Sequence, residues 1–215
     1  MDQEITNNQN NLSFKEKIIR YYNKNKIFIF SFFLFLLIGI ISVSFYISNK
    51  EKRKLHFSDK YIEAKIYLDN NKNEKATEIL RNIILDDENT YAALSFFLIL
   101  EENLIEDKEE LMKLFNLMLE DKKFEEEIKN LIIFKKAIYE SDFVSENELL
   151  ETLKPLINSD TIWKPHALML LGDYFGYKKE NLKAKQFYLQ ILSTKNLQKE
   201  FYDKASLRLS LISNE

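Results

Sequence analysis

Hydrophobic positions follow two different patterns along the chain. From Ile27 to Ile47 the sequence runs without a charge, as IFIFSFFLFLLIGIISVSFYI. From Lys52 onward, apolar residues instead recur every three or four positions, which is the spacing of amphipathic helices. The chain therefore predicts one uniformly apolar helix, followed by a series of helices that each bury one face.

The uncharged run is long enough to cross a bilayer. At about 1.5 Å per residue, a helix over Ile27 to Ile47 spans roughly the 30 Å hydrocarbon core. Three tyrosines stand near its ends, and Lys/Arg residues close it on both sides. A cleaved signal peptide is the alternative, with a Ser-Val-Ser triplet at 42–44, although the apolar run continues past that point. We expect an uncleaved transmembrane helix over 27–47 and a basic tail over 1–26.

The flanking charges do not decide the orientation of this helix. Five Lys/Arg lie within about 18 residues before the run and six lie within the same distance after it, so the positive-inside rule is nearly balanced. The N-terminal stretch over 1–14 is rich in Asn and Gln, which predicts a short disordered tail.

The amphipathic part predicts nine helices separated by short polar breaks. The expected ranges are 52–71, 74–86, 89–103, 107–120, 124–140, 146–158, 164–177, 180–193 and 199–212. Asn89 and Ser145 are candidate N-caps, and Glu148 stands three residues after Ser145 as in a capping box.

Taken in pairs, these helices repeat at nearly constant intervals. First helices begin near residues 55, 89, 124, 165 and 200, with spacings of 34, 35, 41 and 35. A period near 34 residues with two helices per unit is typical of a tetratricopeptide-type solenoid. We therefore predict an all-α fold: one transmembrane helix and then, over 52–215, a solenoid of about four helix pairs plus a capping helix. An irregular helical bundle is the alternative.

Small residues support the pairing. In the last pair Gly172 and Ala184 are placed to let two backbones approach, with Phe175 and Tyr188 beside them. The first pair has Ala64, Tyr67, Ala76 and Leu80 at the equivalent positions, close to three repeats earlier. The two middle pairs match this pattern poorly.

One stretch carries a family resemblance. Pro155-Leu156, then Trp163, then the run His166 to Gly172 (HALMLLG) is similar to the segment that opens the last full repeat in the ancillary subunit of the bacterial Sec translocon. The layout of basic stub, tyrosine pair, single membrane helix and degenerate repeats also resembles that family. The resemblance implies an N-terminus in the cytoplasm and a domain in the periplasm of the bacterial inner membrane. It also implies contact with Sec translocon subunits, periplasmic chaperones and unfolded chains.

The chain offers little that could carry catalysis. It has no cysteine, three glycines and two histidines, and it lacks the common nucleophile, phosphate-loop and zinc-protease motifs. His166 and Asp173 are seven residues apart, too far to share one ion without other ligands. Carboxylate runs such as Glu125 to Glu127 are typical of solvated helix faces. We expect no enzyme activity, cofactor or metal site.

Charge is distributed unevenly. Residues 1–54 carry +5 and residues 55–215 carry −8, which does not suit a nucleic-acid binder. Residues 86–127 alone carry −10, whereas residues 160–215 carry +3. An acidic end could steer basic partners, although solvation of helix faces also explains it and is the interpretation that we favour.

The sequence favours a non-catalytic scaffold that binds proteins. Spare aromatic rings on a concave surface would suit extended chains, and Tyr174, Tyr177 and Tyr202 are the candidates, with core packing as the alternative for each. The leading hypothesis is a translocon accessory factor linked to periplasmic chaperones. The alternative is a scaffold for another envelope complex, in cell division or outer-membrane assembly.

Overall fold

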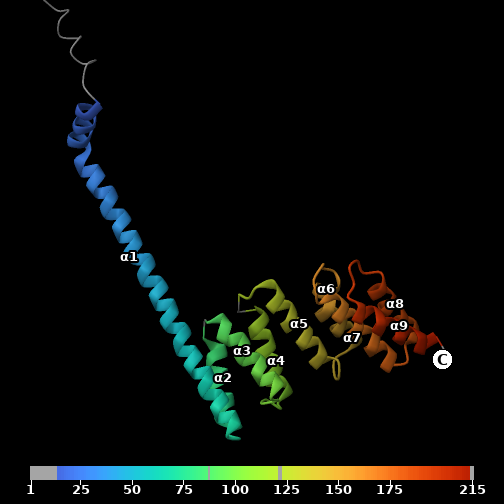
Figure 1. Ribbon diagram of the computed structural model, residues 1–215. Helices are drawn as coiled ribbons and strands as arrows, with labels where there is room; N and C mark the ends of the chain where they lie inside the picture. Colours follow the sequence, from blue (N-terminus) through green and yellow to red (C-terminus); the bar gives the residue numbers. More distant parts are fainter. Residues whose placement is uncertain (1–13, 87, 121–122, 214–215) are drawn as a thin grey trace, which may run out of the picture. The chain divides into compact units, whose positions relative to one another are not determined.

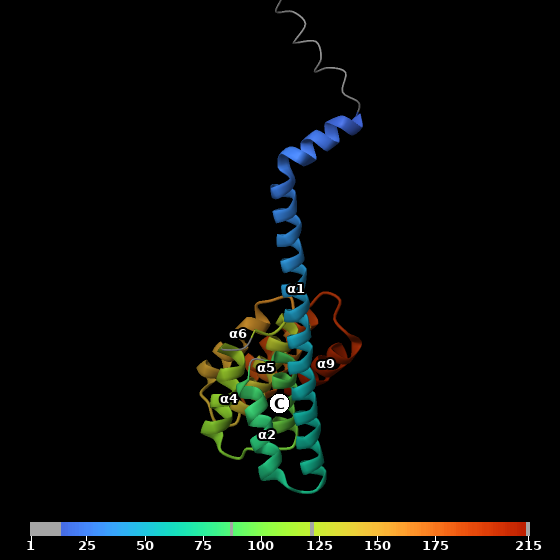
Figure 2. The same ribbon diagram turned by 90° about the vertical axis from the view of Figure 1, so that its left-hand side faces the viewer.

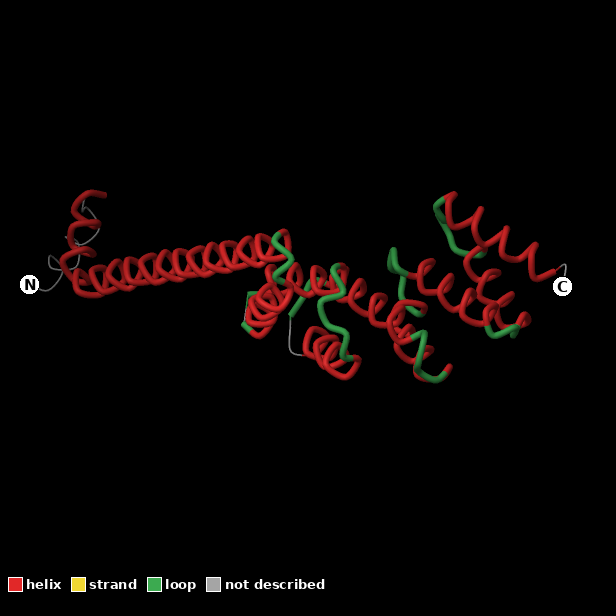
Figure 3. The backbone as a smooth tube through the Cα atoms, turned by 90° about the horizontal axis from the view of Figure 1, so that it is seen from below, coloured by secondary structure: helices red, strands yellow, loops and turns green. Residues whose placement is uncertain are grey.

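The structure is a computed structural model that describes residues 14–86, 88–120 and 123–213. Within those residues it contains nine α-helices and no β-strand (Figures 1 and 3), which confirms the predicted all-α class. The chain divides into two compact units, residues 1–56 and residues 57–215. The tail predicted to be disordered lies outside the described residues, except for Phe14.

The helix boundaries agree with the predicted ranges within a few residues, apart from the first helix. The helices are α1 (Phe14–Asp69), α2 (Asn73–Leu85), α3 (Asn89–Glu101), α4 (Lys108–Glu120), α5 (Glu126–Glu140), α6 (Glu146–Ile157), α7 (Lys164–Tyr177), α8 (Asn181–Leu192) and α9 (Lys199–Ser213). The separate helix expected to begin at residue 52 is wrong, because α1 continues through the charged stretch after the apolar run. That stretch is rich in Lys, Glu and Arg and has no Gly or Pro, so nothing in it ends a helix.

One of the two predicted N-caps is confirmed. The Glu148 backbone N–H donates to the Ser145 hydroxyl at 3.4 Å, and the Ser145 N–H donates to the Glu148 carboxylate at 2.8 Å, which completes the capping box of α6. The prediction for Asn89 is wrong, because the cap of α3 is Glu88, whose carboxylate accepts the Tyr91 N–H at 2.7 Å. Asn89 donates instead to the Lys123 carbonyl at 2.8 Å.

Helices α2 to α9 follow one another in space as they do in sequence. They are arrayed along one direction in Figure 1 and lie behind one another in the view turned by 90° (Figure 2). Contacts join neighbouring helices, and the first helices of successive pairs also meet, as in α5 with α7 and α7 with α9. Each pair thus packs against the next, as in a solenoid.

Three first helices end with the same backbone turn. Each has a residue in the left-handed conformation, followed by a backbone N–H that donates to the carbonyl five residues earlier. The left-handed residues are Asn71 (φ 56°), Asn103 (φ 48°) and Lys179 (φ 62°). The bonds run from Lys72 to Tyr67 (2.9 Å), from Leu104 to Ile99 (3.1 Å) and from Glu180 to Phe175 (2.9 Å). Helix α5 ends differently: Asp142, which follows its C-cap Ser141, does not have a positive φ, and the Val144 N–H donates to the Glu140 carbonyl four residues earlier, so the third pair departs most from the repeat.

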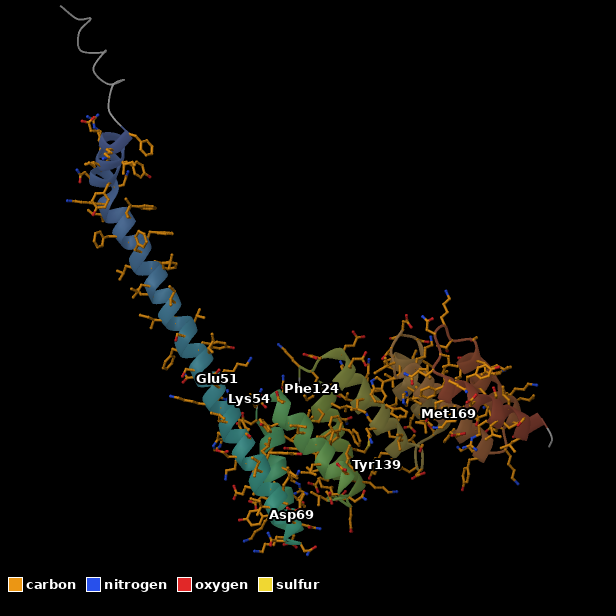
Figure 4. The ribbon with its side chains drawn as sticks, viewed as in Figure 1. Glu51, Lys54, Asp69, Phe124, Tyr139 and Met169 are labelled. Atoms are coloured by element: carbon orange, nitrogen blue, oxygen red, sulfur yellow. The ribbon has the colours of Figure 1, made fainter. Side chains whose placement is uncertain are left out.

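The apolar core of residues 57–215 consists of two clusters that meet in α5. Residues from Ala64 to Ile132 form the first cluster, and residues from Ile133 to Ala205 form the second. Phe96 and Phe115 are centred in the first, with ring centroids 4.9 Å apart, and Tyr139, labelled in Figure 4, packs at its margin. Two adjacent residues of α5 therefore belong to different cores.

Candidate protein-binding site

The first unit contains the membrane-length helix. The described chain has one helix that is long and apolar enough to cross a membrane, and no part of its most apolar 18-residue window is buried. Side chains radiate from the whole circumference of α1 above Glu51 and Lys54 (Figure 4). A helix that is apolar all round and uncovered by protein is suited to lipid. This fits the predicted transmembrane helix over residues 27–47.

The three predicted tyrosines occupy different environments. Tyr174 is 7% exposed within the second cluster, and its hydroxyl accepts a hydrogen bond from the Lys178 amine at 2.6 Å. Tyr177 is 89% exposed and Tyr202 is 54% exposed. The ring of Tyr174 is thus part of the core, which was the alternative interpretation, and the other two rings face solvent. Binding of protein by these residues stays a prediction.

A cavity of about 330 Å³ is lined by residues of helices α7, α8 and α9, and Tyr177 is one of these residues. Its lining includes Asp173, Tyr177, Asn181, Tyr188, Arg208 and Leu211. Polar and apolar groups therefore share one concave surface at the last helix pair and the helix that follows it. We call this surface the α7–α9 site.

The floor of the α7–α9 site depends on a close approach of α7 and α8. The Tyr188 ring lies against Gly172, where a Cβ atom would stand only 2.4 Å from Cε1 of that ring. Only glycine leaves room for this contact. The predicted role of Gly172 in bringing the two helices together is therefore confirmed, and the aromatic ring that fills the space is Tyr188.

The hydroxyl of Tyr188 joins a small polar network. It donates to Oδ1 of Asp173 at 2.7 Å, and Nε of Arg208 donates to the same oxygen at 2.9 Å. One carboxylate oxygen on α7 thus ties together α8 and α9. Because Arg208 uses Nε for this bond, its terminal amino groups lie outside the contact, and its side chain is half exposed.

Burial raises the pKa of Tyr188 well above its usual range, and the hydrogen bond to the negatively charged Asp173 raises it further. Tyr188 therefore stays protonated and acts as a donor at every physiological pH. The arrangement fixes Asp173 and Arg208 before any ligand arrives. It supplies cationic donors beside exposed apolar surface, which suits an extended peptide with carbonyl acceptors and apolar side chains.

His166 lies in an aromatic cluster in the first turn of α7, at the opposite end of the helix from Tyr177. Its ring is 4.6 Å from Phe201 and 5.1 Å from Trp163, measured between centroids. His166 therefore packs against aromatic rings. A smaller cavity of about 220 Å³ lies between the α6–α7 and α8–α9 loops, next to Phe201. Across the residues that the structure describes, no group of three His, Cys, Asp or Glu side chains could hold a metal ion.

Sequence reasoning missed Arg208 and the exposed leucines of α9. Leu207 and Leu211 are 58% and 53% exposed, although α9 was expected only to cover the last apolar face. Their four-residue spacing was a signal, because it puts two leucines on one side of a helix that already buries Ala205 on another. The pairing of Arg208 with Asp173, 35 residues earlier, had no local signal.

The described residues thus combine one membrane-length helix with a domain of stacked helix pairs. No family model matches the chain, and neither a curated protein nor a solved structure matches it.

Proposed function

We propose that this chain is a non-catalytic scaffold, anchored in the bacterial inner membrane by residues 27–47, whose helical domain binds other proteins. In this proposal it is an accessory factor of the Sec translocon and links it to periplasmic chaperones. The N-terminus lies in the cytoplasm and residues 57–215 lie in the periplasm. The translocon assignment and the orientation depend on the family resemblance around Pro155, Trp163 and Gly172.

The observation that carries the proposal is the α7–α9 site. A preformed cavity of about 330 Å³ is lined by Tyr177, Leu211 and Arg208, and the Arg208 side chain is half exposed. Tyrosine and arginine are the residue types that most often dominate protein interfaces. An extended chain could place an apolar side chain against Tyr177 and Leu211, while a backbone carbonyl or carboxylate accepts from Arg208.

The membrane anchor would add to this binding without making a contact of its own. A tether confines the domain to a thin layer at the membrane, which raises its effective concentration toward partners held in the same membrane. Weak recognition at a small site can therefore suffice. The mechanism needs no chemical step.

The test is site-specific cross-linking in the membrane that contains the full-length chain. A photoreactive phenylalanine analogue replaces Tyr177, and in the control chain it replaces Gln190, which lies half a turn round α8 from Asn181 and is also exposed. We expect translocon subunits or a membrane-anchored chaperone to be captured from position 177 and not from position 190. Capture of division or outer-membrane assembly proteins instead would keep the scaffold and reject the translocon assignment.

A second variant tests the contribution of Arg208. Arg208→Ala should reduce capture from position 177, because the cationic donors are lost. The matched control is Lys199→Ala, which removes an exposed cation from α9 half a turn away. Equal capture from 177 in both variants, or equal capture from 177 and 190 in the parent chain, would reject the α7–α9 site as the binding surface.

A further inference from the structure

The first turns of α1, residues 14–26, form a basic amphipathic segment. Its apolar and aromatic side chains are Phe14, Ile18, Ile19, Tyr21 and Tyr22, and all of them are exposed. At 100° per residue, all but Ile19 fall within an arc of about 100°. Glu16, Arg20 and Lys24 fall on the opposite side. The segment therefore has one apolar face and one charged face.

The segment carries a strong positive charge. Residues 14–26 contain five Lys/Arg and one Glu, a net charge of +4. Residues 57–215, by contrast, are acidic in sum. A short basic helix with an apolar face is the composition of helices that lie at membrane surfaces, where basic groups meet anionic headgroups and rings enter the interface.

This segment is bent away from the rest of α1. In Figure 2 the dark blue start of the helix runs across the direction of the part that follows, and Figures 1 and 3 show the same bend. Within this segment the Asn25 side-chain amide donates to the Tyr21 carbonyl, four residues earlier, at 3.2 Å. That carbonyl is the one which the Asn25 backbone N–H uses in a regular helix, and such side-chain competition bends helices.

The bend precedes the apolar run. A helix over 27–47 that crosses the bilayer would place residue 26 at the membrane surface, and a segment turned aside there runs along that surface. We infer that residues 14–26 lie in the headgroup region of the bilayer, with Phe14, Ile18 and Tyr22 toward the acyl chains and Arg20 and Lys24 toward anionic phospholipid headgroups. This inference depends on the proposed membrane anchor, and not on the translocon assignment.

The chain has no cysteine, so single spin labels can be attached to the full-length protein. The variants are Ile18→Cys on the apolar face, Asn23→Cys on the polar face and Leu37→Cys in the middle of the apolar run. Each is reconstituted into vesicles of phosphatidylcholine with about a third phosphatidylglycerol, an anionic surface. Collisions with oxygen report contact with lipid, and collisions with a nickel chelate report contact with water.

We expect Leu37 and Ile18 labels to collide mainly with oxygen, Ile18 at the shallower depth, and the Asn23 label to collide mainly with nickel. If Leu37 is in lipid while Ile18 and Asn23 are equally exposed to nickel, the anchor stands and the inference is overturned. If all three labels are exposed to nickel, the anchor itself fails.

The charge of the lipid provides the second measurement. Replacing phosphatidylglycerol by phosphatidylcholine should raise nickel accessibility at Ile18, and so should Arg20→Glu with Lys24→Glu in anionic vesicles. Each basic residue near an anionic surface favours the bound state by about fivefold, so the double variant should shift Ile18 more than the Leu37 control. Unchanged accessibility at Ile18 in both experiments would overturn the role of anionic lipid.

Discussion

The first helix pair, α1 from Phe57 onward with α2, and the last pair, α7 with α8, use the same turn but different packing partners. Both turns have a left-handed residue, Asn71 or Lys179, at equivalent positions of the two pairs. In the last pair Gly172 lies against Tyr188, and at the equivalent positions of the sequence the first pair has Ala64 and Leu80. All four residues are buried.

That difference explains the polar site of the last pair. Leucine ends in methyl groups, so Leu80 contributes only to the first apolar cluster. Tyrosine needs more room, which glycine supplies, and its hydroxyl reaches Asp173 at the edge of the core. The repeat thus sets where two helices approach. Glycine and tyrosine in place of alanine and leucine at those positions add a polar group to an apolar contact and form the floor of a cavity.

The largest effect is expected from removing the Tyr188 ring. Tyr188→Ala should lower the free energy of unfolding by about 3–5 kcal/mol, the usual cost of deleting a buried aromatic side chain. Urea unfolding of the full-length chain in detergent, followed by the fluorescence of the single Trp163 in the same cluster, measures this loss. Tyr177→Ala is the matched control, because that ring is exposed, and a loss as small as the control's would contradict the described packing.

Exchanging the residues of the two pairs is the second test. Gly172→Ala should cost about 1–3 kcal/mol, because the new Cβ atom overlaps the Tyr188 ring. Adding Tyr188→Leu recreates the Ala64 and Leu80 combination of the first pair. The double variant should therefore lose less stability than the sum of the single variants in the same urea measurement. Additive losses would show that Gly172 and Tyr188 do not depend on each other.

Removing only the hydroxyl of Tyr188 has a smaller effect, and it depends on pH. Tyr188→Phe should cost about 1 kcal/mol at neutral pH, since Asp173 keeps its bond to Arg208. The folded pKa of Tyr188 lies above the unfolded value of 10.0, so its stabilising contribution is complete below about pH 10 and is lost as the pH rises further.

Urea midpoints compared near neutral pH and near pH 11 measure this contribution. The parent chain should lose more stability over that interval than the Tyr188→Phe variant. Burial also raises the pKa values of Tyr61 and Tyr139, so the variant keeps part of the alkaline loss. Identical losses in both chains would contradict the bond between Tyr188 and Asp173.

The smallest effect is expected in the first pair. Ala64→Gly makes that helix resemble the last one, but Leu80 has no ring to use the space. The substitution should cost about 0.5–1 kcal/mol, the usual penalty for glycine in place of alanine within a helix. Far-UV circular dichroism during urea unfolding measures the change. A gain in stability would contradict this expectation, because it would mean that the methyl group of Ala64 is crowded in the first pair.

Periodicity predicted the helices well because each buries one face. The repeat also predicted that Gly172 and Ala184 lie between the helices of the last pair, and both are buried. It failed between residues 48 and 56, where a run of charges resembles a break but consists of good helix formers. It also failed at Asn89, because a neighbouring glutamate can cap a helix as well as an asparagine can.

The candidate site was only partly predictable. Tyr174 and Tyr177 are three residues apart on α7, and such neighbours lie on adjoining parts of one helix face, so spacing cannot tell which ring is buried. Arg208 is recognisable only once α7 and α9 are known to lie side by side. The polar network therefore depends on tertiary contacts that no local pattern encodes.

Helix α5 gives the domain a further property through Ile132 and Ile133, which belong to different apolar clusters. A helix of 15 residues is too short to persist in water without packing. Unfolding of either cluster removes part of the packing that holds α5, which also contributes to the other cluster. The two cores are thus coupled through α5, so that a loss of packing in one cluster weakens the other.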